Sequence, residues 1–172
     1  MTRPQPEDFT EFVRLRSAAL VRSAWLLTGD AGRAEDLLQT VLARVWPRWA
    51  TVVTGGSPDA YVRKMLYTTY LSWYRRRWRF EVPAGTPPEP AGRGDVAGEA
   101  AQRDAVRRAL ATLSRRQRAI VVLRYVEDLP ISATAELLGC STAAVKVQAN
   151  RALAILRRNS HLAAFQETEA LL

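Results

Sequence analysis

Residues 131–152 read ISATAELLGCSTAAVKVQANRA, and this stretch decides the fold. It predicts two helices, about 131–138 and 142–158, because Gly139 can take a left-handed cap and Ser141 can cap the second helix. Small Ala135, Gly139 four residues later and apolar Val145 six residues beyond that meet the spacing of a helix-turn-helix. The alternative is a helical hairpin that only packs.

The second of these helices has a polar face that favours DNA binding. A buried stripe of Val145, Ala149, Ala152 and Leu156 leaves an outward set, which is Lys146, Val147, Asn150, Arg151 and Arg158. Amide and guanidinium groups suit base edges, lysine suits phosphates and valine suits a thymine methyl group. Residues 101–158 contain eleven basic and four acidic residues, a net charge of +7, which also favours DNA.

Helices are predicted throughout the rest of the chain. Upstream of the helix-turn-helix we expect two helices. The first spans about 100–111. The second runs to Tyr125, and Ser114 and Gln117 form a capping box at its start. Nearer the N-terminus we expect helices at about 9–27, 31–46 and 58–79, with Asp30 and Ser57 as caps. The fold class is therefore all-α.

A linker separates the helices into two small domains. Residues 81–100 contain four prolines, four glycines, four acids and one arginine, a net charge of −3. Such a composition predicts a flexible Pro/Gly-rich tether, so we expect the two domains to move independently. We assign 7–80 to the first domain, 81–99 to the linker, 100–158 to the second domain and 159–172 to a C-terminal tail without function.

The predicted helix before the linker is basic and aromatic. Residues 60–80 contain six basic residues, seven aromatics and no acid. Lys64, Thr68, Arg75 and Arg79 share one side with Tyr61, while Val62, Leu66, Thr69 and Trp73 form a core stripe. A third row, Tyr67, Tyr70, Tyr74 and Trp78, either closes the core, which base rates favour, or stacks on unpaired bases. The cations indicate a phosphate backbone or an acidic partner, and a merely solvated face is the alternative.

Composition excludes several other classes of protein. The chain has 172 residues, a net charge of +8, one cysteine and one histidine, so it offers neither a disulfide nor a zinc cage nor a histidine pair for a catalytic metal. We therefore expect no cofactor, no metal and no enzyme activity. The sequence shows neither an export signal nor a long apolar run, which predicts a cytoplasmic, nucleoid-associated protein without membrane contact.

Three motifs together resemble the extracytoplasmic-function (ECF) group of bacterial RNA polymerase sigma factors, group 4 of the sigma-70 family, and among them the actinobacterial SigE-like type. The motifs are AEDLLQTVLARVW at 34–46, DAYVRK at 59–64 with the Trp-Tyr-Arg-rich helix end, and EDL, AELLGCS, VK and NRA between 127 and 152. Thr40 and Thr68 depart from the family pattern, in which glutamate and asparagine are common.

The resemblance implies a role for each motif. It implies that 7–80 is sigma region 2, that Asp36, Gln39, Thr40 and Arg44 bind the β′ clamp coiled coil of core RNA polymerase, and that the loop before the third helix is a specificity loop. It implies that the third helix reads and melts the minus-10 element through Tyr61, Lys64, Thr68, Arg75, Arg76 and Arg79. Sigma region 4 at 100–158 then reads the minus-35 element through Lys146, Val147, Gln148, Asn150, Arg151 and Arg158.

The expected partners are core polymerase, promoter DNA and an anti-sigma factor, and two other classes of function stay open. One is an ordinary helix-turn-helix regulator that binds an operator unaided. The other is a small nucleic-acid enzyme, for which the sequence offers neither a carboxylate cluster nor a nucleophile–base set. The tether matters for the sigma interpretation, because two promoter elements one and a half duplex turns apart are separated by about 50–60 Å at ~3.4 Å per base pair.

Overall fold

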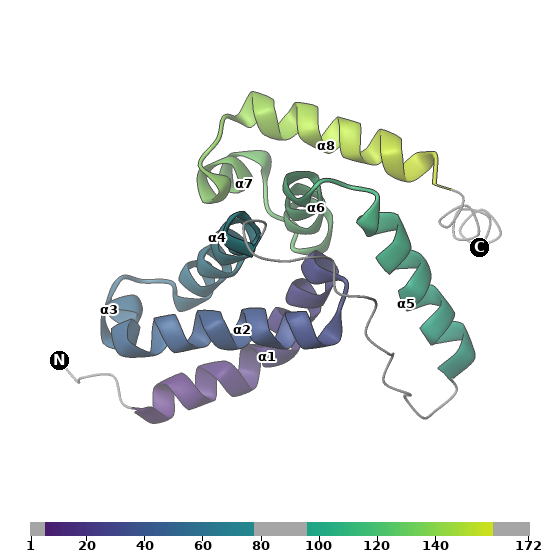
Figure 1. Cartoon of the computed structure of the whole chain (residues 1–172). Helices are drawn as coiled ribbons and strands as arrows, with labels where there is room; N and C mark the ends of the chain where they lie inside the picture. Colours follow the sequence, from purple (N-terminus) through teal and green to yellow (C-terminus); the bar gives the residue numbers. More distant parts are fainter. Residues whose placement is uncertain (1–5, 78–95, 160–172) are drawn as a thin grey trace.

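The computed structural model describes residues 6–77 and 96–159, and every regular element in these residues is a helix. This confirms the all-α prediction. Figure 1 shows the elements in chain order, which are α1 (Pro6–Thr28), α2 (Ala31–Val45), η1 (Trp46–Arg48), α3 (Trp49–Thr54), α4 (Pro58–Arg77), α5 (Val96–Ala111), α6 (Arg115–Val121), η2 (Val122–Val126), α7 (Ile131–Leu138) and α8 (Thr142–Arg157).

The predicted helix caps are present. The Asp30 carboxylate accepts a hydrogen bond from the Arg33 backbone N–H at 2.8 Å. Ser114 and Gln117 form the complete capping box at the start of α6. Gly139 ends α7 with a φ of 63°, and the Ser141 hydroxyl accepts from the Ala144 N–H at 3.1 Å. These contacts are local, which is why the sequence predicts them.

Three elements differ from the predictions. Residues 47–54, expected as a loop, complete η1 and form the short helix α3, because Trp49 and Val52 turn into the core. The helix expected to run to Tyr125 changes to a π-helical turn, η2, at Val122. Helix α5 begins at Val96, so residues 96–99 of the expected linker are helical, whereas residues 78–95 and the tail from 160 lie outside the described part of the chain.

Helices α1 to α4 form the N-terminal module. Helix α2 packs between α1 and α4 and buries the predicted stripe of Ala34, Leu37, Leu38, Val41 and Val45, with Leu42 half-buried. Helix α4 adds Val62, Leu66 and Thr69, as predicted, and it also buries Tyr67 and Tyr70 completely. The core role that base rates favour for these two tyrosines is therefore confirmed.

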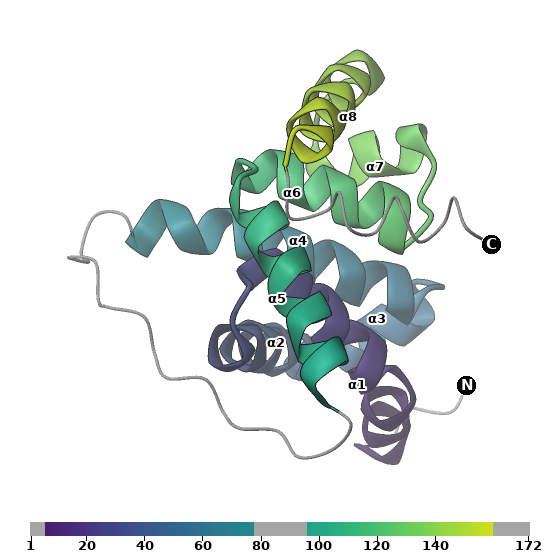
Figure 2. The same ribbon diagram turned by 90° about the vertical axis from the view of Figure 1, so that its right-hand side faces the viewer.

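Helices α5 to α8 form the C-terminal module, in which α6 and α7 support α8. Val145 and Ala149 of α8 are buried against α6 and α7, where Ile120 and Ala135 meet them. Ala152 is buried in a second cluster with Leu110 and Val121. Small residues at these positions let the helices approach closely. Three of the four predicted stripe residues of α8 are thus buried, Leu156 is half-buried, and the opposite side of the helix faces outward (Figure 2).

The two modules, which the sequence predicts to move independently, pack against each other in the described residues and share one core. Ala119, Val122 and Leu123 of the C-terminal module belong to the same buried cluster as Leu27 and Tyr67 of the N-terminal module. The Arg118 guanidinium donates to the Leu27 carbonyl at 2.9 Å across the junction. Linker composition predicts a tether, but it carries no information about apolar surface on the modules themselves.

Gly139 provides a test of the turn between α7 and α8. Its left-handed φ of 63° would strain any other residue at this position. The strain comes from the backbone alone, because an added Cβ would have no atom within 4 Å. We expect Gly139→Ala to lower the free energy of unfolding by about 1–2 kcal/mol. Gly98→Ala is the matched control, because Gly98 lies in helix α5 with equally open space, and there alanine stabilises by up to about 1 kcal/mol. Chemical denaturation measures both, and equal effects of the two substitutions contradict the strained turn.

Candidate nucleic-acid and protein interfaces

The outer face of α8 presents the predicted polar set to solvent. Lys146, Val147, Asn150, Arg151 and Arg158 are all exposed, and Val147 keeps 47% of its surface accessible. An exposed valine beside amide and guanidinium groups fits a surface that meets base edges and a methyl group. The helix is long enough to lie in a major groove, which admits one α-helix.

Gln148 is placed differently from the other predicted reading residues. It is half-buried, and its amide oxygen accepts a hydrogen bond from the Gln117 side-chain amide at 3.3 Å. Gln117 also closes the capping box of α6. Gln148 therefore ties α8 to the start of α6.

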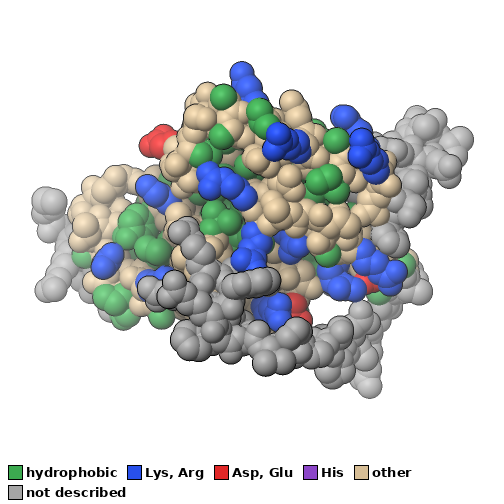
Figure 3. All heavy atoms as spheres, turned by 45° about the horizontal axis from the view of Figure 1, so that its top comes forward, with side chains coloured by type: hydrophobic (Ala, Val, Ile, Leu, Met, Phe, Trp, Pro, Cys, Tyr) green, Lys and Arg blue, Asp and Glu red, His purple; other side chains and the backbone are tan. Residues whose placement is uncertain are grey.

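Positive charge surrounds α8 in the C-terminal module. Within residues 98–159 the exposed acids are Glu99, Asp128 and Glu136, whereas the exposed cations are Arg103, Arg108, Arg116, Lys146, Arg151, Arg157 and Arg158. Figure 3, which brings α8 to the front, shows Lys and Arg side chains spread over this face with few acids among them. Such a face attracts a phosphate backbone.

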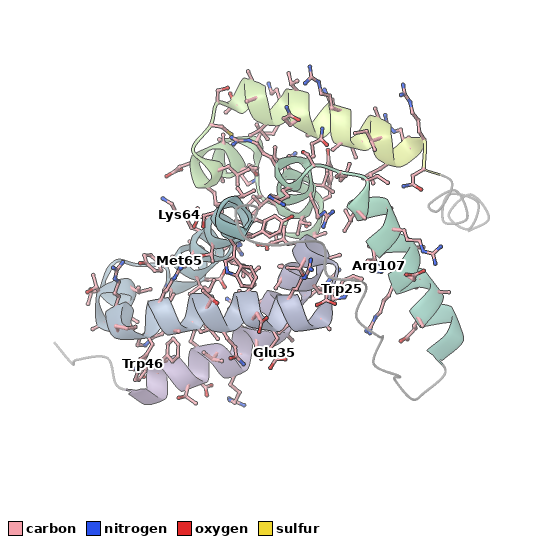
Figure 4. The ribbon with its side chains drawn as sticks, in the orientation of Figure 1. Trp25, Glu35, Trp46, Lys64, Met65 and Arg107 are labelled. Carbon is pink, nitrogen blue, oxygen red and sulfur yellow. The ribbon has the colours of Figure 1, made fainter. Side chains whose placement is uncertain are left out.

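Helix α4 presents a second, narrower polar face. Lys64, Thr68 and Ser72 are exposed on it, and Figure 4 shows Lys64 on the side of α4 away from α2. The Thr68 hydroxyl donates to the Lys64 carbonyl at 2.8 Å, so its one donor is used within the helix. Arg75 and Arg76 continue α4, but their side chains, and the whole of Arg79, lie outside the described part of the structure.

A hollow lies where α3 meets the start of α4. Its volume is about 480 Å³, and its lining residues are Arg48, Thr51, Val52, Gly55, Ser57 and Tyr61. Volumes in this range accept a small organic ring system. The hollow combines a cation, hydroxyls and the half-buried ring of Tyr61, and the sequence prediction included Tyr61 but missed Arg48. The sequence feature that could have indicated Arg48 is its position between two tryptophans, Trp46 and Trp49. Trp49 is buried.

The exposed face of α2 contains the predicted polymerase-binding residues. Asp36, Gln39 and Arg44 are exposed, and Figure 4 shows Glu35 on the same helix. The Arg44 guanidinium reaches α4, where it donates to the Thr69 hydroxyl at 3.4 Å. Thr40 is half-buried, and its hydroxyl donates to the Asp36 carbonyl at 2.7 Å. The helix thus offers the exposed Asp36 carboxylate, the Gln39 amide, which donates to Glu35 at 3.4 Å, and the Arg44 guanidinium anchored on α4.

Two further properties of residues 6–77 and 96–159 concern metal ions and membranes. These residues contain no cluster of three or more His, Cys, Asp or Glu side chains that could hold a metal ion. No helix among them combines the length and apolar character that crossing a bilayer requires.

Comparison with known proteins identifies both modules. Residues 12–80 match the family model for sigma-70 region 2, and residues 103–156 match the model for sigma-70 region 4. The RNA polymerase sigma-E factor of Streptomyces coelicolor is 41% identical over 150 residues, which cover 87% of this chain and 84% of that protein. The ECF sigma factor SigL of Mycobacterium tuberculosis is 31% identical, with 82% of each chain covered. The chain belongs to the ECF sigma factors. It is therefore an alternative sigma factor, which binds core RNA polymerase and directs promoter-specific initiation of transcription.

A solved structure supports the same assignment for the fold. The sigma factor RpoE of Bartonella quintana, crystallised with the anti-sigma factor NepR, superposes with a TM-score of 0.66 at 25% identity. The match covers 88% of this sigma factor and 95% of that chain. The agreement extends over both modules.

Proposed function

We propose that this sigma factor divides promoter recognition and polymerase binding among three helices, with 7–80 acting as region 2 and 100–158 as region 4. Helix α8 reads the minus-35 duplex, α4 and the hollow at its start capture the minus-10 element, and α2 binds the β′ clamp coiled coil of core polymerase. The observation that carries the proposal is that one chain exposes two polar helix faces suited to DNA, on α4 and on α8, in separate modules.

At the minus-35 element, Asn150 and Arg151 contact base edges. Both are exposed near the middle of α8, and each offers two polar groups for a bidentate contact. Lys146 and Arg158 contact phosphates toward the two ends of the helix, and Val147 meets a thymine methyl group. Gln148 belongs to this interface as a positioning residue through Gln117.

At the minus-10 element, α4 holds DNA strands that are already separating. Unstacking a base costs a few kcal/mol, and stacking it on an aromatic ring returns about 1–3 kcal/mol. The hollow beside Tyr61 and Arg48 offers such a surface for one unpaired base, while Lys64, Arg75, Arg76 and Arg79 supply charge along the backbone. Thr68 contributes as an acceptor, because its donor is satisfied by Lys64.

At the polymerase, α2 supplies Asp36, Gln39 and Arg44, with Thr40 supporting the helix through its bond to the Asp36 carbonyl. We also propose an anti-sigma factor as a regulatory partner, supported by the similar sigma factor of Bartonella quintana, which was solved with one. The protein catalyses no bond chemistry itself and acts in the cytoplasm on nucleoid DNA.

Promoter binding with and without polymerase tests the proposal. We expect the protein alone to bind promoter duplex weakly, and its complex with core polymerase to bind the same duplex at least a hundredfold more tightly. Fluorescence anisotropy with labelled promoter DNA measures both. Tight, sequence-specific binding by the free protein, unchanged by polymerase, is the result expected of an ordinary operator-binding regulator and contradicts the proposal.

The hollow gives a separate prediction for strand capture. Tyr61→Ala is expected to weaken binding of polymerase-bound protein to DNA with unpaired minus-10 bases by about 1 kcal/mol, because one stacking surface is lost. Tyr61→Phe keeps the ring and should bind normally. Binding to fully paired duplex is the internal control, and an equal loss there indicates a folding defect instead of lost stacking.

A further inference from the structure

The turn after η2 projects one carboxylate, that of Glu127, out of the C-terminal module. The Glu127 N–H donates to the Val122 carbonyl at 3.0 Å, and the Leu129 N–H donates to the Leu123 carbonyl at 2.9 Å. Asp128 adopts a left-handed φ of 51°, and the Arg124 guanidinium donates to the Leu129 carbonyl. The backbone around Glu127 is thus held at both ends, which fixes the direction of its side chain.

Among the described residues, three side chains donate to this carboxylate, and all of them belong to the N-terminal module. The Tyr67 hydroxyl donates to it at 2.6 Å and the Ser23 hydroxyl at 2.9 Å. The Arg63 guanidinium donates to its other oxygen and forms an ion pair with it. The Glu127 side chain is only 13% exposed, so these bonds replace most of its hydration.

The contact continues into the N-terminal module as a line of alternating charges. Arg63 also pairs with Asp59 at 3.0 Å, and Asp59 pairs with Arg16 of α1 at 3.2 Å. A small cavity of about 230 Å³ lies beside this line, between α1, α4 and the Glu127 turn. Burial raises the pKa of the Tyr67 hydroxyl above its usual range, and the negative charge of Glu127 raises it further, so Tyr67 stays a neutral donor.

This closed arrangement conflicts with reading two promoter elements at once. Helix α7 contacts α4, and α8 packs on α7, so α8 lies two packing layers from α4. With packed helices 8–10 Å apart, that places the two reading helices roughly 20 Å from each other. The two elements of a promoter are separated by about 50–60 Å at ~3.4 Å per base pair. The modules must therefore part before both elements are bound.

We propose that Glu127 is a latch, which holds this sigma factor closed until core polymerase and promoter DNA draw the modules apart. The inference rests on the proposed function, in which α4 and α8 act on different promoter elements. Polymerase that binds only the open form shifts the population toward it by its difference in affinity for the two forms. The latch thereby disfavours simultaneous promoter contacts by free protein while leaving the exposed faces of α2 and α8 available.

Single-molecule energy transfer on the full chain tests the latch. Dyes are attached at Ala50→Cys in α3 and Ala154→Cys in α8, both exposed, in a Cys140→Ser background. The free protein is expected to show mainly one short distance. Glu127→Ala should raise the ratio of open to closed molecules at least tenfold, because Arg63, Tyr67 and Ser23 lose their shared acceptor. Adding core polymerase to the labelled protein that keeps Glu127 should lengthen the distance between the two dyes.

Two further variants make the test specific. Tyr67→Phe removes one hydroxyl from the same contact without changing the buried ring, so it should shift the ratio in the same direction by a smaller factor. Glu136→Ala removes an exposed glutamate from the same module and should leave the ratio unchanged. Circular dichroism checks that each variant keeps its helix content. If Glu127→Ala loses helix content, Tyr67→Phe serves as the test in its place.

The outcomes separate this inference from the function on which it rests. A free protein that shows mainly long distances overturns the latch, and so does a Glu127→Ala variant as closed as Glu136→Ala. Both results come from the free chain and leave polymerase binding untouched. Failure of polymerase to bind the chain at all overturns the proposed function, while the distances of the free protein still decide whether Glu127 closes it.

Discussion

Replacing Asp36 by arginine is expected to weaken binding of the protein to core RNA polymerase at least about thirtyfold. Asp36 is an exposed carboxylate on the face of α2 opposite the buried stripe, and Thr40 and Arg44 lie on the same polar side. Reversing a charge that pairs across a protein interface costs about 2–5 kcal/mol, because the partner cation is left facing a like charge. Promoter-directed transcription should fall in proportion at limiting protein concentration.

The control for Asp36 is Glu136→Arg, which makes the same charge reversal on an exposed residue of α7. Titration of dye-labelled protein with core polymerase measures both affinities, and thermal unfolding should be unchanged in both because neither side chain is buried. Equal affinities of the two variants for core polymerase would mean that Asp36 does not contact polymerase.

Arg151→Ala is expected to cost about 1–3 kcal/mol at a preferred minus-35 sequence and to relax the preference at one base position. The reason is geometric, because the exposed guanidinium on α8 can form two hydrogen bonds to one base edge. Lys146→Ala should instead weaken binding to every sequence alike and reduce the salt dependence by about one phosphate contact.

A panel of minus-35 duplexes with every single-base change, bound by the polymerase-containing complex, measures the two effects together. The two variants act as controls for each other, because they lie on the same exposed face of one helix. If Arg151→Ala lowers the affinity for every duplex of the panel equally, Arg151 is a phosphate contact. Asn150 and Val147 are then the residues that contact the bases.

Local features of the fold were predictable because they depend on neighbouring residues. Asp30, Ser114, Gly139 and Ser141 each act within three residues along the chain, so their caps are visible in the sequence. The outward face of α8 was predictable for the same reason, because a helix repeats every 3.6 residues. Helix α3 was missed because the apolar residues of a six-residue helix, Trp49 and Val52, do not establish a period.

The contact between the modules was not predictable from such patterns. Glu127 meets Ser23 across 104 positions of sequence and Tyr67 across 60, and nothing near Glu127 identifies those partners. Gln148 shows the same limit on a smaller scale. Its place in the motif indicates a reading residue, but its burial and its bond to Gln117 depend on how α6 crosses α8.

The most direct test of the account is transcription in vitro with purified, sigma-free core polymerase on a pool of genomic DNA, with and without this protein. The account predicts new transcription starts that appear only with the protein and that share two spaced upstream motifs, one for each reading helix. An absence of protein-dependent starts, together with tight binding of the free protein to a single duplex site, would contradict it.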